Sequence, residues 1–149
     1  MIHKDLSIIS PCYNEEHNIP ELVKRLLKTV EKIDLEAEII LIDDGSSDNT
    51  GKVIQNIVDQ YDGLVIGYKN EKNLGIEASW KNGLKICSGR YVCIIDSDLQ
   101  YQPEAINRLY KELQYSNADI VQGYRSSIGR LKDSRKTLSL VLNFLLNFF

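Results

Sequence analysis

An apolar segment that ends in two closely spaced carboxylates constrains this chain more than any other feature. Residues 91–95 read Tyr-Val-Cys-Ile-Ile, and Asp96 and Asp98 follow directly. Such a run is typical of a strand that is buried on both faces of a parallel sheet. In open α/β sheets, ligands bind beyond the carboxyl ends of these strands. Two acids in that place suit a divalent cation, which prefers oxygen ligands and could in turn hold a diphosphate.

Strand-like and helix-like segments alternate along the chain, which predicts an α/β fold with a mostly parallel, Rossmann-like sheet and helices on both faces. Strands are expected at 6–10, 38–42, 64–68, 91–95 and 119–122, and helices around 19–33, 53–61, 76–87, 103–113 and from 138 onward. Pro11 is expected to close the first strand and Asn18 to cap the first helix, whereas Gly83 weakens the helix at 76–87. We expect a single domain over residues 1–149.

Composition narrows the class of protein. The chain has 149 residues and a formal net charge of −3, so overall charge gives no case for nucleic-acid binding. Three cysteines in apolar contexts, without metal-ligand spacing, favour reduced thiols in a cytosolic protein. No signal peptide is expected, and no apolar stretch reaches the roughly 18 residues of a membrane span.

Three predicted strands end in polar clusters, and the carboxyl ends of parallel strands meet at one edge of a sheet. The clusters are Pro11-Cys12-Tyr13-Asn14-Glu15-Glu16, Asp43-Asp44-Gly45-Ser46-Ser47-Asp48 and Asp96-Ser97-Asp98. Each has a plainer interpretation as a turn, a helix cap or a solvated loop. Their coincidence at three strand ends favours one shared ligand crevice.

With these segments the chain resembles the family-2 glycosyltransferases of the GT-A fold. The resemblance rests on Ser10–Glu15, Ile42–Thr50, Asn73-Leu74-Gly75 with Gly83 and Ser88-Gly89, and Asp96–Gln100 with Pro103-Glu104. The Asp-Leu-Gln segment followed by Pro-Glu looks most like the corresponding segment of the polyprenyl-phosphate sugar transferases, such as dolichyl-phosphate mannosyltransferase and the undecaprenyl-phosphate enzymes. Gly123-Tyr124-Arg125 with Arg130 is similar to a further block of that subgroup.

The resemblance implies roles for individual residues in binding a UDP- or GDP-linked sugar. The base and ribose pocket would be lined by Pro11, Tyr13 and Glu15. Asp43 would bind the base edge, with Asp44, Gly45 and Ser46 nearby. The donor would also lie beside Asn73 and Gly75. Asp96 would face the ribose or sugar phosphate, and Asp98 would be the main ligand of Mg²⁺ or Mn²⁺, with Gln100 in or near the metal shell. The implied reaction is an inverting displacement at the anomeric carbon.

The acceptor side is less defined. A polyprenyl-phosphate acceptor is anionic near neutrality and needs cationic positioning more than a general base, so Arg125 and Arg130 are candidates to bind its phosphate. A glycan acceptor stays an alternative, and no general base can be placed.

The basic run before an apolar tail predicts a helix over 135–149 that lies in a membrane interface or packs on downstream sequence, two alternatives that stay open. An interfacial helix would place the protein at the inner face of the membrane, and a homo-oligomer is compatible with the sequence.

The apolar end at Phe149 suggests a cut through a longer protein. The competing prediction is therefore a catalytically incomplete nucleotide-sugar-binding module that needs further sequence or a partner chain. A receiver-like signalling domain would need a lysine after a late strand, and residues 119–123 offer none.

Overall fold

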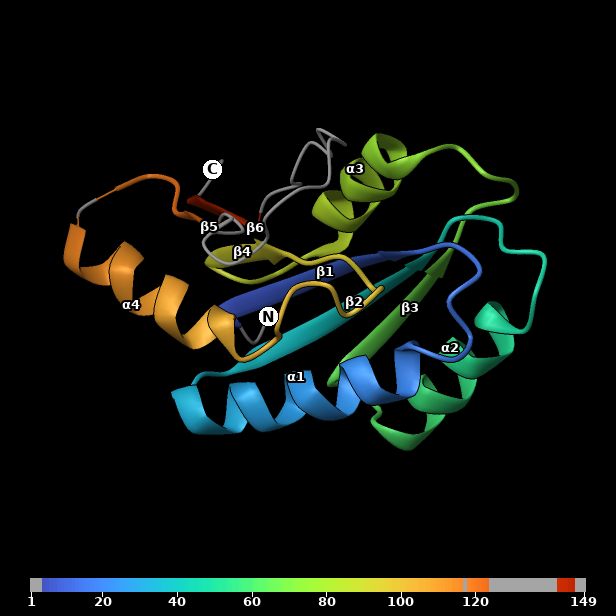
Figure 1. The fold of residues 1–149 in the computed structure, drawn as a ribbon, viewed down its shortest axis with the longest axis horizontal. Coiled ribbons are helices and arrows are strands. Elements are labelled where there is room, and N and C mark those ends of the chain that lie inside the picture. Colours follow the sequence, from blue (N-terminus) through green and yellow to red (C-terminus); the bar gives the residue numbers. More distant parts are fainter. Residues whose placement is uncertain (1–3, 117, 124–141, 147–149) are drawn as a thin grey trace, which may run out of the picture.

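The computed structural model describes residues 4–116, 118–123 and 142–146, and its centre is a six-stranded sheet in the order β3-β2-β1-β4-β6-β5 (Figure 1). The strands are β1 (Leu6–Cys12), β2 (Ala37–Asp43), β3 (Val65–Lys69), β4 (Tyr91–Ile94), β5 (Gln122–Gly123) and β6 (Leu142–Leu146). β1 to β4 run parallel, whereas β6 runs antiparallel to both β4 and β5. The predicted α/β fold with a mostly parallel sheet is confirmed.

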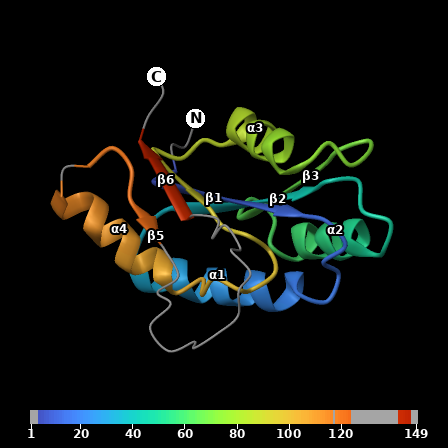
Figure 2. The ribbon, with the colours of Figure 1, turned by 45° about the horizontal axis from the view of Figure 1, so that its top comes forward.

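Helices cover both faces of the sheet, as predicted (Figures 1 and 2). The helices are α1 (Ile19–Ile33), α2 (Thr50–Gln60), α3 (Ile76–Ile86) and α4 (Ala105–Ser116). α1, α2 and α4 pack on one face around the larger apolar core. α3 alone covers the other face among the described residues, through Trp80 and Ile86 on the strand residues Ile9 and Ile40. Both faces of β1 and β2 are therefore buried, which explains the adjacent apolar residues Ile8 and Ile9 in β1 and Ile39–Ile42 in β2.

β1 does not stop at Pro11 but continues through it to Cys12. Its pairing with β2 runs to Cys12↔Asp43, whereas its pairing with β4 stops at Ile9↔Ile94. Proline is tolerated where a strand has no ladder hydrogen bond to lose, and Pro11 lies past the last pair with β4.

α1 begins where the sequence predicts, but the Asn18 side chain does not cap it. The Glu15 carbonyl instead accepts the backbone N–H groups of Asn18 and Ile19. The Asn18 amide donates to Glu15 Oε2 (2.6 Å), so it holds a cleft residue rather than the helix end.

The predicted helix from Leu138 is wrong over the part that the structure describes, because residues 142–146 form strand β6. Its spacing of polar residues satisfied a helical period, but the free edge of β4 offers backbone hydrogen bonds that local periodicity does not reveal. β6 takes that edge, with Tyr91 paired to Leu146. Arg125, Arg130 and residues 135–141 lie outside the described residues. No helix among the described residues is both long and apolar enough to cross a bilayer.

Gly83 is explained by packing, since a Cβ there would lie 2.5 Å from Ile9 Cγ2. We expect Gly83→Ala to lower the free energy of unfolding by about 1–3 kcal/mol despite the better helix propensity of alanine, because Ile9 is fully buried and cannot move aside. Urea unfolding measures this. Lys81→Ala, at an exposed position of the same helix, is the control, and an equally stable Gly83→Ala would contradict the close approach.

Candidate functional site

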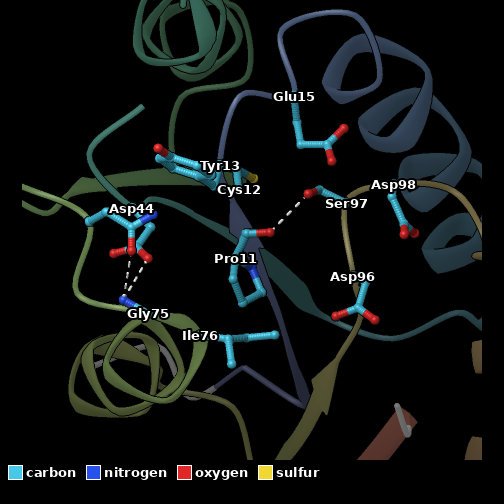
Figure 3. A pocket seen from close by; sticks show the side chains of 11 residues that line it. Pro11, Cys12, Tyr13, Glu15, Asp44, Gly75, Ile76, Asp96, Ser97 and Asp98 are labelled. Carbon is cyan, nitrogen blue, oxygen red and sulfur yellow. Dashed lines mark hydrogen bonds between the residues drawn. The ribbon is translucent and has the colours of Figure 1, made fainter. Parts of the chain in front are cut away.

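A cleft of about 310 Å³ opens at the carboxyl ends of β1, β2 and β4 (Figure 3). It lies where the strand order reverses, between β1 and β4, which is the usual ligand position in open α/β sheets. Its lining is Pro11, Cys12, Tyr13, Glu15, Asp44, Asn73, Gly75, Ile76, Asp96, Ser97 and Asp98. Most of the predicted site residues therefore come together, whereas Asp43, Ser46 and Gln100 do not line the cleft.

One end of the cleft carries the carboxylates of Asp96 and Asp98 (Figure 3). Ser97 between them is buried, and its hydroxyl donates to the Pro11 carbonyl (2.9 Å), which ties this segment to β1. The Gln100 backbone N–H donates to Asp98 Oδ1 (3.0 Å), so the turn after the strand holds that carboxylate as well. The two acids are thus fixed on one short turn.

Burial, and then the negative charge of Asp98, raise the pKa of the Asp96 carboxyl. A carboxylate whose charge is disfavoured by a neighbouring carboxylate forms a place where a cation is favourable. The described residues contain no group of three or more histidine, cysteine, aspartate or glutamate side chains that could hold a metal by itself. The donor set therefore fits a divalent cation only if a ligand supplies further oxygen atoms.

The opposite end of the cleft is built on Asp44, which is 5% exposed (Figure 3). Its Oδ1 accepts the Leu74 N–H and its Oδ2 accepts the Gly75 N–H, both at 2.9 Å. Burial disfavours the charged carboxylate, but the hydrogen bonds from Leu74, Asn70 and Gly75 outweigh it and lower the pKa of Asp44. Asp44 thus holds the loop that forms this wall.

Asp43 has a different environment from its neighbour. Its side chain is 2% exposed, and its Oδ1 accepts the Ser46 N–H (2.9 Å), which closes the turn after β2. Oδ2 has no hydrogen-bond partner and lies 3.8 Å from Lys69 Nζ. The carboxylate of this pair that faces the cleft is therefore that of Asp44.

The loop after β1 and the loop after β2 are joined by hydrogen bonds from backbone N–H groups of each loop to side chains of the other. Residues 14–16 and 46–50 exchange hydrogen bonds, namely Asn14 N–H to Ser46 Oγ, Glu15 N–H to Thr50 Oγ1, Glu16 N–H to Asp48 Oδ2, Ser47 N–H to Asn14 Oδ1 and Asn49 N–H to Glu16 Oε2. These contacts satisfy backbone donors that would otherwise be unpaired in the loops before α1 and α2. The side chains of Ser46, Asp48 and Glu16 therefore hold the loops that form the cleft without lining it themselves.

Sequence reasoning assigned no role at the cleft to Cys12, Ile76 and Ser97. Cys12 is buried, which raises the pKa of its thiol to about 12, so it contributes a neutral side chain. Ile76 is the first residue of α3 and lies beside Pro11 and Asp96 (Figure 3). Their positions next to Pro11, Gly75 and Asp96 in sequence were the available signal.

Comparison with known proteins decides the family. The family model described as "Glycosyl transferase family 2" matches residues 7–148. The chain belongs to this family. This family-2 chain is 35% identical over 140 residues to an undecaprenyl-phosphate 4-deoxy-4-formamido-L-arabinose transferase of Proteus mirabilis. The match covers 93% of this chain and 42% of the relative. The protein of the same name from Salmonella choleraesuis is 33% identical over 145 residues, covering 96% and 43%. The chain thus spans less than half the length of these relatives.

Solved structures support the GT-A fold of this family-2 chain. The mannosyltransferase PcManGT from Pyrobaculum calidifontis, in complex with GDP-Man and Mn²⁺, superposes with a TM-score of 0.72 at 18% identity, over 87% of this chain and 38% of that one. S. aureus TarS 1-349 in complex with UDP-GlcNAc gives a TM-score of 0.61 at 27% identity, over 87% and 37%.

The Asp44 hydrogen bonds generate a stability prediction. The pKa of Asp44 is lower in the folded than in the unfolded chain, so its ionised form stabilises the fold above about pH 4, and this is lost as pH falls through the folded-state pKa. We expect Asp44→Asn to lower the free energy of unfolding by about 1–3 kcal/mol at pH 7 and by less in acid. Asp59→Asn, on the exposed face of α2, is the control. Denaturation at pH 7 and pH 3 tests this, and equal losses at both would refute it.

Proposed function

We propose that this chain forms the donor-binding part of a glycosyltransferase that moves a sugar from a UDP- or GDP-linked donor to a polyprenyl phosphate. The observation that carries the proposal is a cleft at the reversal of strand order, with a buried carboxylate at one end and a pair of carboxylates at the other. Family membership and the similarity to transferases named for undecaprenyl-phosphate support it. The expected course is a single inverting displacement.

The donor would lie along the cleft with its base near Tyr13 and Asp44. Tyr13 is 48% exposed, so its ring is free to stack on a base, and Asp44 takes the role that the sequence suggested for Asp43. Pro11 and Glu15 would complete the base and ribose pocket, and Asn73 and Gly75 would flank the donor. This orientation puts the diphosphate toward Asp96 and Asp98.

A divalent cation, Mg²⁺ or Mn²⁺, would be held by Asp98 and Asp96, with Gln100 close by and donor phosphate oxygens completing the ligand set. All-oxygen ligands suit either ion. The bound cation would supply stabilisation of the negative charge on the departing nucleoside diphosphate. The complexes of PcManGT with Mn²⁺ and GDP-Man give a precedent for such a site in this fold.

For the acceptor we propose that Arg125 and Arg130 bind the lipid phosphate. A phosphate monoester has a second pKa of about 6, so its oxygens are largely deprotonated near neutrality and need orientation more than a base. Guanidinium groups bind such oxygens in a bidentate manner. A lipid acceptor would place the reaction at the cytoplasmic face of a membrane, and residues 130–149 are the candidate contact with it.

A second candidate function is a nucleotide-sugar-binding module that is incomplete as a catalyst. The match to the Proteus mirabilis relative covers 93% of this chain but only 42% of the relative. This favours the alternative for the 149-residue chain alone. Donor binding without transfer to any acceptor, restored by additional sequence or a partner chain, would support it.

Donor binding is testable by thermal unfolding with a panel of UDP- and GDP-sugars, each with and without MgCl₂ or MnCl₂. A ligand at 100 times its Kd stabilises a fold by about 2.7 kcal/mol, so we expect a clear metal-dependent rise in Tm for at least one donor. Asp98→Asn should lose that rise. Asp62→Asn, in an exposed loop, removes the same charge as a control. A panel without any metal-dependent rise would refute the proposed function.

The acceptor proposal predicts that Arg125→Ala lowers transfer to undecaprenyl phosphate in detergent by roughly tenfold or more, since a charge-assisted contact to phosphate is lost. Arg108→Ala, at an exposed position of α4, is the matched control. Product formation is followed with labelled donor. Unchanged transfer by Arg125→Ala would contradict the role of Arg125 while leaving donor binding intact.

A further inference from the structure

A buried asparagine lies behind the wall of the cleft and has no role in the proposed function. Asn70 directly follows β3 and is 3% exposed. Its backbone N–H donates to the Asp43 carbonyl (2.9 Å), which continues the pairing of β3 with β2. Its side chain therefore sits at a fixed place between the end of β2 and helix α3.

The Asn70 amide connects α3 to Asp44. Its Nδ2 donates to Asp44 Oδ1 (2.7 Å) and to Ser79 Oγ (3.1 Å), while its Oδ1 accepts from Asn82 Nδ2 (2.9 Å). A carboxylate only accepts hydrogen bonds, so the Nδ2 group must face Asp44 and the Oδ1 atom must face Asn82. The Asp44 carboxylate therefore determines which way the Asn70 amide points, and the Asn82 donor stabilises that orientation.

Asp44 connects the Asn70 amide to the backbone that lines the cleft. The same Oδ1 that accepts from Asn70 also accepts the Leu74 N–H, and Oδ2 accepts the Gly75 N–H. Gly75 has φ +87°, one of the many backbone conformations open to glycine, and the Asp44 contact selects it. Rotation of the Asp44 carboxylate would release that contact and move a lining residue of the cleft.

We propose that Asn70 is a positioning residue of the donor cleft, which holds the Asp44 carboxylate and the 74–75 backbone in the geometry that receives the nucleotide. The inference rests on the proposed function, because it acts through the residue assigned to the base. Ser79 and Asn82 hold the Asn70 amide, and Asn70 itself does not line the cleft.

Asn70→Asp tests the contact, because it replaces the amino group facing Asp44 with an oxygen of the same size. We expect the Kd for UDP or GDP, measured by calorimetry with MnCl₂, to rise roughly tenfold or more, since the buried Asp44 carboxylate loses one of its donors and faces an acceptor instead. Gln55→Glu is the matched control. Gln55 also donates to a carboxylate, Asp59 Oδ1 at 2.8 Å, but on an exposed face of α2.

Asn82→Asp tests the direction of the amide without changing Asn70, and covers the case in which Asn70→Asp does not fold. An acid at this partly exposed position puts an acceptor in place of the donor to Asn70 Oδ1, so Asn70 Nδ2 is attracted by two carboxylates instead of one and Oδ1 loses its partner. We expect a rise in Kd of roughly fivefold, and recovery of most of the affinity in Asn82→Gln, which keeps the donor. A purely structural role would lower Tm in these variants without changing the Kd of the folded protein.

The outcomes separate the two proposals. If the unmodified chain binds UDP or GDP and the folded Asn70→Asp and Asn82→Asp variants bind it equally well, the positioning role is wrong and the proposed function stands. If the unmodified chain binds neither nucleotide, the proposed function fails and the inference fails with it.

Discussion

The cleft depends on the unequal pairing of β1 with its two neighbours. β1 stays hydrogen-bonded to β2 as far as Cys12↔Asp43, but it separates from β4 after Ile9↔Ile94. The sheet therefore opens on one side of Pro11 only, and the Ser97 hydroxyl spans the opening to the Pro11 carbonyl. Most lining residues take their position from this divergence, because the loops after β1, β2 and β4 leave the sheet there, and the segment from Asn73 to Ile76, after β3, completes the lining.

The many acids at this edge are divided between two tasks. Glu16 and Asp48 accept backbone N–H groups from the facing loop, and Asp43 closes its own turn. Backbone N–H dipoles stabilise the negative charges of these carboxylates, and Lys69 Nζ lies 3.8 Å from Oδ2 of Asp43. Asp96 is different, since burial and the negative charge of Asp98 raise the pKa of its carboxyl. The carboxylate pair that suits a cation is thus confined to one end of the cleft.

The sequence predicted the parallel sheet, its helices and most of the cleft lining, because these depend on local periodicity and on the meeting of strand ends. It did not predict β6, whose partner β4 lies about 50 residues earlier and leaves no local signal. It assigned the base edge to Asp43, whereas the carboxylate that lines the cleft is that of Asp44. Asp43 ends β2 and Asp44 follows it, and which of two adjacent side chains faces the cleft depends on a register that only the folded sheet defines. Asn70 belongs to no recognisable pattern at all.

Apolar packing and polar positioning are coupled through α3. The absence of a side chain at Gly83 lets α3 approach Ile9 of β1 closely. The preceding residue is Asn82, which reaches the Asn70 amide only because the helix lies at that distance from the sheet. A wider separation would lengthen the bonds of Asn82 and Ser79 to Asn70 together, since both come from the same rigid helix. The geometry of the Asp44 carboxylate is therefore set by the same contact that buries the apolar face of α3, which explains why a glycine stands in the middle of a helix there.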